Sequence, residues 1–178
     1  GGDGFREQIA VVISNPPRDR PVPVRIHSAC LTGDLFGSLK CDCGDQLRGT
    51  VRVMAELGGG IVLYLDQEGR GNGLVNKLRA YTLHAAGEDT YEADARLGFE
   101  ADQRRFDFAA EMLKQLGYTS VRIMTNNPNK IEALRKAGLD VVSTHRVLAR
   151  STAHNVKYLA AKRDKAGHLL GDAALDAI

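Results

Sequence analysis

Three cysteines, Cys30, Cys41 and Cys43, are the residues of this sequence best suited to chemistry. They are all the cysteines of the 178-residue chain, and they lie close together along it. Catalytic zinc sites use three protein ligands and leave a fourth position to water, whereas structural zinc sites usually have four protein ligands. Water in that fourth position is acidified and becomes a nucleophile for hydrolysis. The cluster therefore predicts a hydrolytic zinc centre.

Two other interpretations of the cysteines stay open at this stage. Buried, unpaired cysteines are common in protein cores. A redox pair of thiols is a third reading, weakened because the sequence has no C-x-x-C motif. The odd number of cysteines argues against a disulfide scaffold and favours a reducing, cytoplasmic setting. A dense set of polar residues around the cluster favours zinc: Arg25, His27, Ser28, Thr32, Asp34, Ser38 and Asp42.

Two segments, Asp66–Gly73 and Thr125–Lys130, each follow a predicted strand and precede a predicted helix. Glycines in the first segment would let backbone N–H groups approach an anion, although its pattern is neither a Walker A loop nor G-x-G-x-x-G. In the second segment a hydroxyl, helix amides and Lys130 would suit a phosphate. An ordinary strand-to-helix turn and an N-cap followed by proline are equally good explanations.

The segment Asp102–Arg105 is predicted to open a helix, where two arginines lie unfavourably at the positive end of the helix dipole. A bound anion would offset that cost, and a solvated charge cluster is the alternative. Tyr81 lies on the apolar face of its predicted helix, so packing is its default role. His84, His145 and His154 have no evident partners in the sequence.

Strands and helices alternate along the chain, which predicts an α/β (or α+β) domain with a mixed β-sheet flanked by helices. We expect one domain over residues 1–178, with flexible ends at 1–8 and 171–178. Short apolar runs predict strands at 9–13, 22–26, 61–65, 121–124 and 141–147. Helical spacing of apolar residues predicts helices at 46–57, 74–83, 106–116 and 128–137.

The composition is that of a globular protein, with 24 Lys+Arg, 22 Asp+Glu and 43% hydrophobic residues. These values exclude collagen-like and wholly disordered chains. No apolar run is long enough to cross a bilayer, and no signal peptide is evident. Aromatic residues are only 6% and no basic stripe is present, which argues against nucleic-acid binding. The chain begins without Met, so we interpret it as a processed or trimmed piece.

Several blocks of the sequence together resemble the GTP cyclohydrolase II family of riboflavin biosynthesis. Arg25–Asp34 and Ser38–Gly44, which contain the cysteines, carry the strongest resemblance. The match runs from Ile9 to Leu170, and so many blocks in one order are not expected by chance. The further blocks are Gln67–Gly71, Asn76–Tyr81, Leu97–Phe99, Thr125–Pro128 and Gly167–Leu170.

This resemblance implies a zinc- and magnesium-dependent hydrolysis that opens the guanine imidazole ring of GTP and releases formate and pyrophosphate. The implied product is 2,5-diamino-6-ribosylamino-pyrimidinone 5'-phosphate, made in the first step of riboflavin biosynthesis. One zinc ion per chain and Mg²⁺ with the triphosphate are implied cofactors. The family also implies a cytoplasmic homodimer, and in some relatives a dihydroxybutanone phosphate synthase domain precedes this one.

The family's functional residues can be carried over position by position. The three cysteines match the zinc ligands, whose water attacks C8 of the base. Asp102 matches the proposed proton acceptor, Tyr81 a tyrosine implicated in ring opening, and Arg104 a residue proposed to attack the α-phosphate. Because a guanidinium is almost always protonated, charge stabilisation is the more conservative role for Arg104. The GTP-contacting positions match Arg25, Ile26, His27, Ser28, Gln46, Glu68, Gly69, Arg70, Thr90, Thr125 and Lys130.

The chemistry of these side chains agrees with the implied roles. Arg70, Arg104 and Lys130 could surround a triphosphate with positive charge. Glu68 is a suitable bidentate acceptor for the N–H donors on the Watson–Crick edge of guanine.

The sequence also departs from the family's usual pattern, without losing a proposed ligand or catalytic group. The departures leave open two rivals on the same fold, a paralogue arrested at a formylamino product and one acting on another nucleotide, whereas the retained Tyr81 argues for the complete reaction. A catalytically silent binding domain is a further rival, disfavoured because Asp102 and Arg104 are retained. The departures are Ala29 for Glu, Asn72 for an apolar residue, Asp94 for Asn, Gln103 for Glu and Ala161 for Thr.

Overall fold

A computed structural model describes residues 7–85, 102–147, 155–156, 159–160 and 164. The contacts of the chain divide it into two compact units. Of the described residues, the first unit comprises 7–29, 47–66 and 105–147, and the second comprises 30–46, 67–85, 102–104, 155–156, 159–160 and 164.

The first unit is built on a five-stranded mixed sheet, as the sequence predicts. The strand order is β1-β3-β2-β4-β5, in which β1 runs antiparallel to β3 and the other neighbours are parallel. This arrangement confirms the α/β fold class. The strands are β1 (Gln8–Ile13), β2 (Val22–Ser28), β3 (Gly60–Leu65), β4 (Ser120–Met124) and β5 (Asp140–His145).

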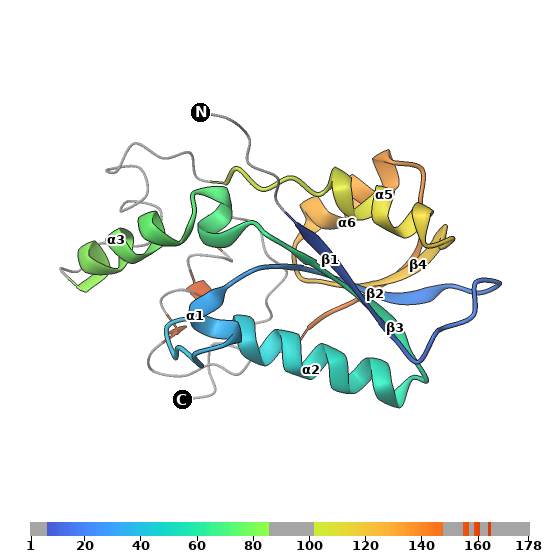
Figure 1. Cartoon of the computed structure of the whole chain (residues 1–178), viewed down its shortest axis with the longest axis horizontal. Helices are drawn as coiled ribbons and strands as arrows, with labels where there is room; N and C mark the ends of the chain where they lie inside the picture. Colours follow the sequence, from blue (N-terminus) through green and yellow to red (C-terminus); the bar gives the residue numbers. More distant parts are fainter. Residues whose placement is uncertain (1–6, 86–101, 148–154, 157–158, 161–163, 165–178) are drawn as a thin grey trace. The chain divides into compact units, whose positions relative to one another are not determined.

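Helices cover both faces of this sheet (Figure 1). Helices α5 (Asp107–Gln115) and α6 (Pro128–Lys136) lie together over one face, and α2 (Cys43–Glu56) runs along the other. Central strand β2 is buried at every position from Val22 to His27, as expected for a parallel strand covered on both sides.

Two apolar layers hold the helices to the sheet. Alternate residues of the strands face α5 and α6, including Ile26, Leu63 and Ile123, which pack with Leu113 and Leu134 of the two helices. All five side chains are fully buried, which contributes roughly 1.5–3 kcal/mol for each one. On the opposite face a smaller cluster forms around the α2 side of the sheet, made of Met54, Val62, Met124 and Val147.

The second unit contains short helical elements and loops. Its described elements are α1 (Leu31–Asp34), the first turn of α2, the 3₁₀ turn η1 (Glu68–Gly71) and α3 (Leu74–Ala85). Inside η1 the backbone of Gly69 and Arg70 is left-handed, with φ of 59° and 58°. The N–H groups of Gly71, Asn72 and Gly73 donate to carbonyl oxygens within this turn. The ordinary-turn interpretation therefore accounts for these glycine positions.

One predicted helix start was wrong. Residues 102–106 are not helical, and α5 begins only at Asp107. The physical reason is local, since Asp102 Oδ1 accepts a hydrogen bond from the backbone N–H of Arg104 at 3.1 Å. A side-chain bond to the backbone two residues ahead competes with helix formation.

The remaining predicted elements of the first unit are confirmed with ends shifted by a few residues. The glycines expected to end helices do so, with positive φ at Gly58, Gly117 and Gly138. None of the helices among the described residues combines the length and the apolar character needed to span a membrane.

Candidate functional site

The sulfur atoms of Cys30, Cys41 and Cys43 all lie within 4.8 Å of one another, in the second unit. Cys30 directly precedes α1 and Cys43 opens α2, so two helix starts position two of the three thiols. Cys30 and Cys41 are buried and Cys43 is half-buried. Separations of this size allow three sulfurs to ligate one ion, because Zn–S bonds are about 2.3 Å long.

The backbone of Gly33 completes this three-cysteine cluster. A Cβ added at Gly33 would lie 2.7 Å from Cys41 Sγ and 3.1 Å from Cys30 Sγ. A contact of 2.7 Å is shorter than real Cβ atoms make, and one of 3.1 Å is unusually tight, so a side chain at this position would push the sulfurs out of place. The chain therefore has a glycine where the thiols need room, and the residues present fit a metal held by three thiolates.

The thiols influence one another's protonation. The pKa of the Cys30 thiol is lowered because Cys41 and Cys43 donate hydrogen bonds to its sulfur, with further help from the positive charge of Lys77. The pKa of the Cys41 thiol is raised to about 11, because it donates to Cys30 and is buried. Cys30 is therefore the thiol that loses its proton first, and the thiolate is the form that binds a metal ion.

Lys77 of α3 connects the cluster to η1. Its Nζ donates to Cys30 Sγ at 3.0 Å and to Glu68 Oε1 at 2.8 Å. Both side chains of the Lys77–Glu68 pair are mostly buried, with 14% and 11% exposed. Burial acts to lower the pKa of Lys77, but the charge of the Cys30 thiolate and the bond to Glu68 outweigh it, and the pKa is raised.

The Glu68 carboxylate accepts hydrogen bonds from the backbone of two separate segments. Its Oε2 accepts from Leu31 N at 2.6 Å, directly after the first cysteine, and its Oε1 accepts from Gly69 N at 3.0 Å. Together with Lys77, these donors fix the orientation of the carboxylate.

Tyr81 lies one helical turn after Lys77 on the same face of α3. Its hydroxyl is 3.4 Å from Thr32 Oγ1, which is in turn 3.7 Å from Cys30 Sγ. The ammonium group of Lys40 lies 4.7 Å from the centre of the tyrosine ring. Partial burial raises the pKa of Tyr81, so the phenol is protonated at neutral pH.

Asp102 and Arg104 form a two-pronged ion pair beside η1. The guanidinium donates through Nε at 2.8 Å and Nη2 at 2.5 Å to the two carboxylate oxygens. Gln103 N donates to Arg70 O at 3.0 Å, which ties this segment to the glycine turn. Partial burial acts to raise the pKa of Asp102, but Arg104 and the charge of Arg70 outweigh it and hold the pKa below its ordinary value.

Gln46 and Asp42 are both buried at the start of α2. The Gln46 side-chain amide donates to the Asp42 carboxylate. The predicted substrate contact Gln46 thus lies in α2 within one turn of Cys43, with its side chain held by Asp42.

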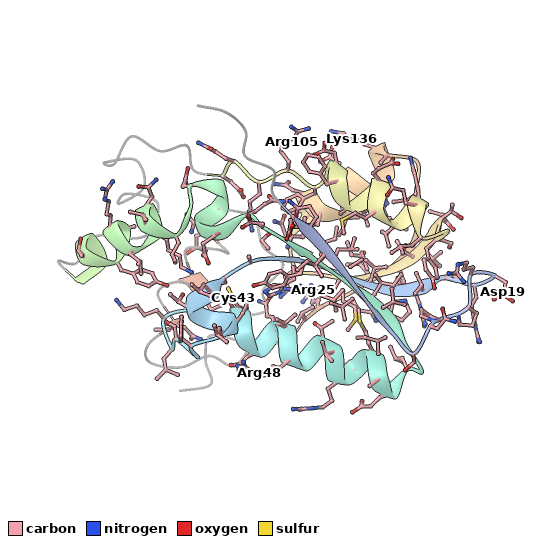
Figure 2. The ribbon with its side chains drawn as sticks, in the orientation of Figure 1. Asp19, Arg25, Cys43, Arg48, Arg105 and Lys136 are labelled. Atoms are coloured by element: carbon pink, nitrogen blue, oxygen red, sulfur yellow. The ribbon has the colours of Figure 1, made fainter. Side chains whose placement is uncertain are left out.

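The first unit holds another group of predicted site residues. Arg25 of β2 is buried within the sheet (Figure 2), and its Nη1 donates to Met124 O at 3.1 Å. Lys130 of α6 is also buried, and its Nζ donates to Ile26 O at 2.8 Å. The ammonium group lies 5.2 Å from the centre of the Phe106 ring. Two cations that the sequence places 105 positions apart thus both bond to backbone carbonyls of this unit.

The end of β2 carries the next two predicted contacts. The His27 ring stacks on Tyr64 of β3, with 5.5 Å between the ring centres. Ser28 Oγ is buried and has no hydrogen-bond partner among the described residues. An orphaned hydroxyl of this kind is available to a ligand.

The side chains of Thr125 and Asn127 stabilise the start of α6 by hydrogen bonds to the backbone. Thr125 Oγ1 accepts from Asn127 N at 3.0 Å, and Asn127 caps the helix by accepting from Asn129 N at 2.9 Å. Pro128 occupies the first turn, as the N-cap interpretation predicts.

A family model for GTP cyclohydrolase II matches residues 3–146. The chain belongs to the GTP cyclohydrolase II family. A relative from Azotobacter vinelandii, named GTP cyclohydrolase-2, is 50% identical over 166 residues, which are 93% of this chain and 80% of the relative. One from Shewanella amazonensis with the same name is 47% identical, over 94% of this chain and 82% of the relative.

Relatives of greater length also match. The GTP cyclohydrolase-2 of Xylella fastidiosa strain 9a5c is 51% identical over all 178 residues of this chain. This chain spans about 44% of the length of that relative. Membership of the GTP cyclohydrolase II family confirms the resemblance found in the sequence.

The structure brings together many of the residues that the family pattern singles out. The three cysteines, Glu68 and Tyr81 are joined by contacts through Lys77 and Thr32. Sequence reasoning gave Lys77 no role of its own. Its spacing of four residues from Tyr81 was a signal, because residues so spaced share a helix face. Thr90, Asp94, Leu97–Phe99, Ala161 and Gly167–Leu170 lie outside the described residues.

Proposed function

We propose that this chain acts as a GTP cyclohydrolase II, hydrolysing GTP with opening of the guanine imidazole ring and release of formate and pyrophosphate. The product is 2,5-diamino-6-ribosylamino-pyrimidinone 5'-phosphate, which begins riboflavin biosynthesis. Family membership supports this activity. The observation that carries it is the cluster of three thiols, since hydrolysis at a formamidine-like carbon needs an activated water.

The three-cysteine cluster is proposed to hold one zinc ion per chain. Thiolate sulfurs suit zinc, whereas magnesium prefers oxygen ligands. Three protein ligands leave a fourth position open, as in catalytic zinc sites. A zinc ion there would supply Lewis acidity and a water acidic enough to react near neutral pH. We propose that Mg²⁺ accompanies the triphosphate of the substrate.

Asp102 is proposed as the proton acceptor. Its lowered pKa keeps the carboxylate ionised at neutral pH, so it is able to accept a proton. Arg104 donates a hydrogen bond to each oxygen of the Asp102 carboxylate and thereby orients it. Because the guanidinium stays protonated, we assign Arg104 to stabilise negative charge on the α-phosphate rather than to attack it.

Tyr81 is proposed to act as a hydrogen-bond donor during ring opening. Its raised pKa keeps the phenol protonated. The contact with Thr32 and the Lys40 ammonium over its ring hold the side chain in one orientation.

Glu68 is proposed to contact guanine through a single oxygen, not through both oxygens as expected from the sequence. Its Oε1 already accepts from Lys77 and Gly69, whereas its Oε2 accepts only from Leu31 among the residues that the structure describes. A carboxylate oxygen has two acceptor positions, so Oε2 retains one. The other proposed GTP contacts are Arg25, Ile26, His27, Ser28, Gln46, Gly69, Arg70, Thr90, Thr125 and Lys130.

A second candidate is a paralogue that stops at the formylamino product or acts on another nucleotide. Ala29 favours it, because a methyl group stands where the family usually has a carboxylate, next to Cys30. The backbone of Ala29 is held in place, since its N–H donates to Leu65 O at 2.8 Å.

Mass spectrometry of GTP incubated with the zinc-loaded protein and Mg²⁺ tests these candidates. We expect the diaminopyrimidinone product together with formate. A formylated product would instead support the second candidate, and Ala29→Glu should then restore formate release. Unchanged GTP, with zinc present at one ion per chain, would overturn the proposal.

Partners and location are proposed from the family alone. We propose a cytoplasmic homodimer that binds neither membrane nor nucleic acid, with GTP as its substrate. A fused or separate dihydroxybutanone phosphate synthase partner is compatible with the longer Xylella relative, of which this chain spans 44%. Light scattering of the purified protein would give the mass of the assembly.

A further inference from the structure

Lys77 is a charged residue that the proposed reaction does not use, although it touches two groups of the candidate site. Its Nζ lies 3.0 Å from Cys30 Sγ and 2.8 Å from Glu68 Oε1. The side chain is 14% exposed. An ammonium group this well covered needs partners, and in this structure those partners are a thiol of the metal cluster and a carboxylate.

The aliphatic part of the Lys77 side chain also has a close neighbour, the backbone of η1. A Cβ added at Gly69 would lie 3.2 Å from Lys77 Cβ, so the backbone of η1 packs closely against α3 at this point. Gly69 also has a left-handed φ of 59°, which a side chain rarely adopts. The glycine thus allows the close approach that directs the ammonium group at the sulfur.

The contact between Lys77 and Cys30 would balance the charge of the metal centre. Three thiolates around one Zn²⁺ ion carry a net charge of −1, in a place where two of the three cysteines are buried. The positive charge of Lys77 would cancel it. A hydrogen bond to a thiolate ligand also sets the orientation of the sulfur and its donor strength.

We propose that Lys77 is a positioning residue of the metal centre, which neutralises the three-thiolate site and holds the Cys30 sulfur toward the ion. Glu68 keeps the ammonium group in place, and through its bond to Leu31 N it also anchors the residue after Cys30. The pair therefore connects the metal ligand, the glycine turn and α3. This inference rests on the proposed function, because it assumes that the cysteines hold zinc.

Zinc affinity, measured by competition with a chromophoric chelator, tests the role of Lys77. We expect Lys77→Met to weaken zinc binding by roughly 10- to 100-fold, the usual effect of losing a group that supports a metal ligand. The matched control is Lys136→Met. Lys136, labelled in Figure 2, pairs with Glu132 on the surface of α6, with 75% of its side chain exposed.

A second readout separates a role at the sulfur from a merely structural one. In the cobalt-loaded protein the thiolate-to-metal charge-transfer band reports on the electron density of the ligating sulfurs. We expect this band to shift in Lys77→Met and to be unchanged in Lys136→Met. Glu68→Gln should shift the zinc affinity in the same direction by a smaller factor, because the ammonium group remains but loses one restraint.

The outcomes distinguish failure of this inference from failure of the proposed function. Zinc binding by the wild-type chain with equal affinity in Lys77→Met, and an unshifted cobalt band, would overturn the role of Lys77 alone. Absence of zinc binding in the wild-type chain would overturn the metal centre itself. Should Lys77→Met fail to fold, the test is Glu68→Gln. An unchanged zinc affinity in that variant would overturn the proposal that Glu68 and Lys77 together support the metal centre.

Discussion

The sulfur atoms of Cys30 and Cys41 lie 3.7 Å apart, although the two residues are 11 positions apart in the sequence. The loop between them closes because Gly33 lets the backbone pass directly against both sulfurs. Asp34 secures the same turn, since its carboxylate accepts from Cys30 N at 3.0 Å. The geometry of the three-cysteine cluster is thus set by the loop as much as by the cysteines.

Gly33→Ala is expected to lower zinc affinity by roughly tenfold or more, because the new methyl group would displace Cys41 Sγ and Cys30 Sγ. Chelator competition measures the change. Gly49→Ala is the matched control, since a Cβ there meets nothing within 4 Å. Gly49 lies inside α2, so its replacement should leave zinc affinity unchanged and raise the free energy of unfolding by about 0.5–1 kcal/mol.

Removal of the metal is expected to loosen the second unit selectively. All three thiols belong to that unit, so a chelator should increase amide hydrogen exchange in residues 30–46 and 67–85. Strands β2, β3 and β4 should keep their protection, because their apolar core contains no metal ligand. Equal loss of protection in both units would contradict this prediction.

Arg70 is expected to carry backbone strain, because it is a non-glycine residue with a φ of 58°. Arg70→Gly and Arg70→Ala both remove the guanidinium, so their difference isolates the backbone. The glycine variant should be more stable by about 1 kcal/mol in urea unfolding. Equal stabilities would show that the turn relaxes at no cost.

Asp102 should titrate at a higher pH in the Arg104→Gln variant than in the wild type. Partial burial acts to raise the pKa of this carboxyl, and removing the guanidinium takes away the main opposing influence. Carbon-13 NMR of the side-chain carboxyl measures the midpoint directly. An unchanged midpoint would mean that Arg104 does not control the protonation of Asp102.

The same ion pair predicts how stability depends on pH. A carboxyl with a lowered folded-state pKa contributes stability above its unfolded-state pKa, here the ordinary value of 3.8, and loses it as the pH falls through the folded-state pKa. Asp102→Asn should therefore be less stable than the wild type at pH 7, and the difference should shrink at pH 3 and below. Urea unfolding at both pH values provides the test.

Lys130→Met is expected to cost about 1–3 kcal/mol in the free energy of unfolding, because Ile26 O would lose its buried donor. Lys136→Met, on the exposed face of the same helix, should change it by less than about 0.5 kcal/mol. If Lys130 served only to bind phosphate, both variants would be equally stable without ligand.

Much of the first unit followed from local sequence. Short apolar runs predicted the strands because a buried strand must be apolar on each face that it covers. Gly58, Gly117 and Gly138 predicted three helix ends because each takes a left-handed φ that other residues avoid. The start of α5 escaped this reasoning, since Asp102 bonds locally to the backbone and its sequence does not reveal which bond wins.

The candidate site was predictable only in part. Clustering of the cysteines indicated the candidate metal ligands, and ordered motifs indicated the family. The proposed role of Lys77 could be found only from the tertiary structure, because Lys77 contacts Cys30 from 47 positions away in the sequence. Lys130 likewise donates to a carbonyl 104 positions distant. Sequence by itself determined which groups this protein has for chemistry and where its helices end, because those depend on residue type and near neighbours. Only the packing of distant segments decided which charges meet, because contacts across the chain depend on how its elements lie together in three dimensions.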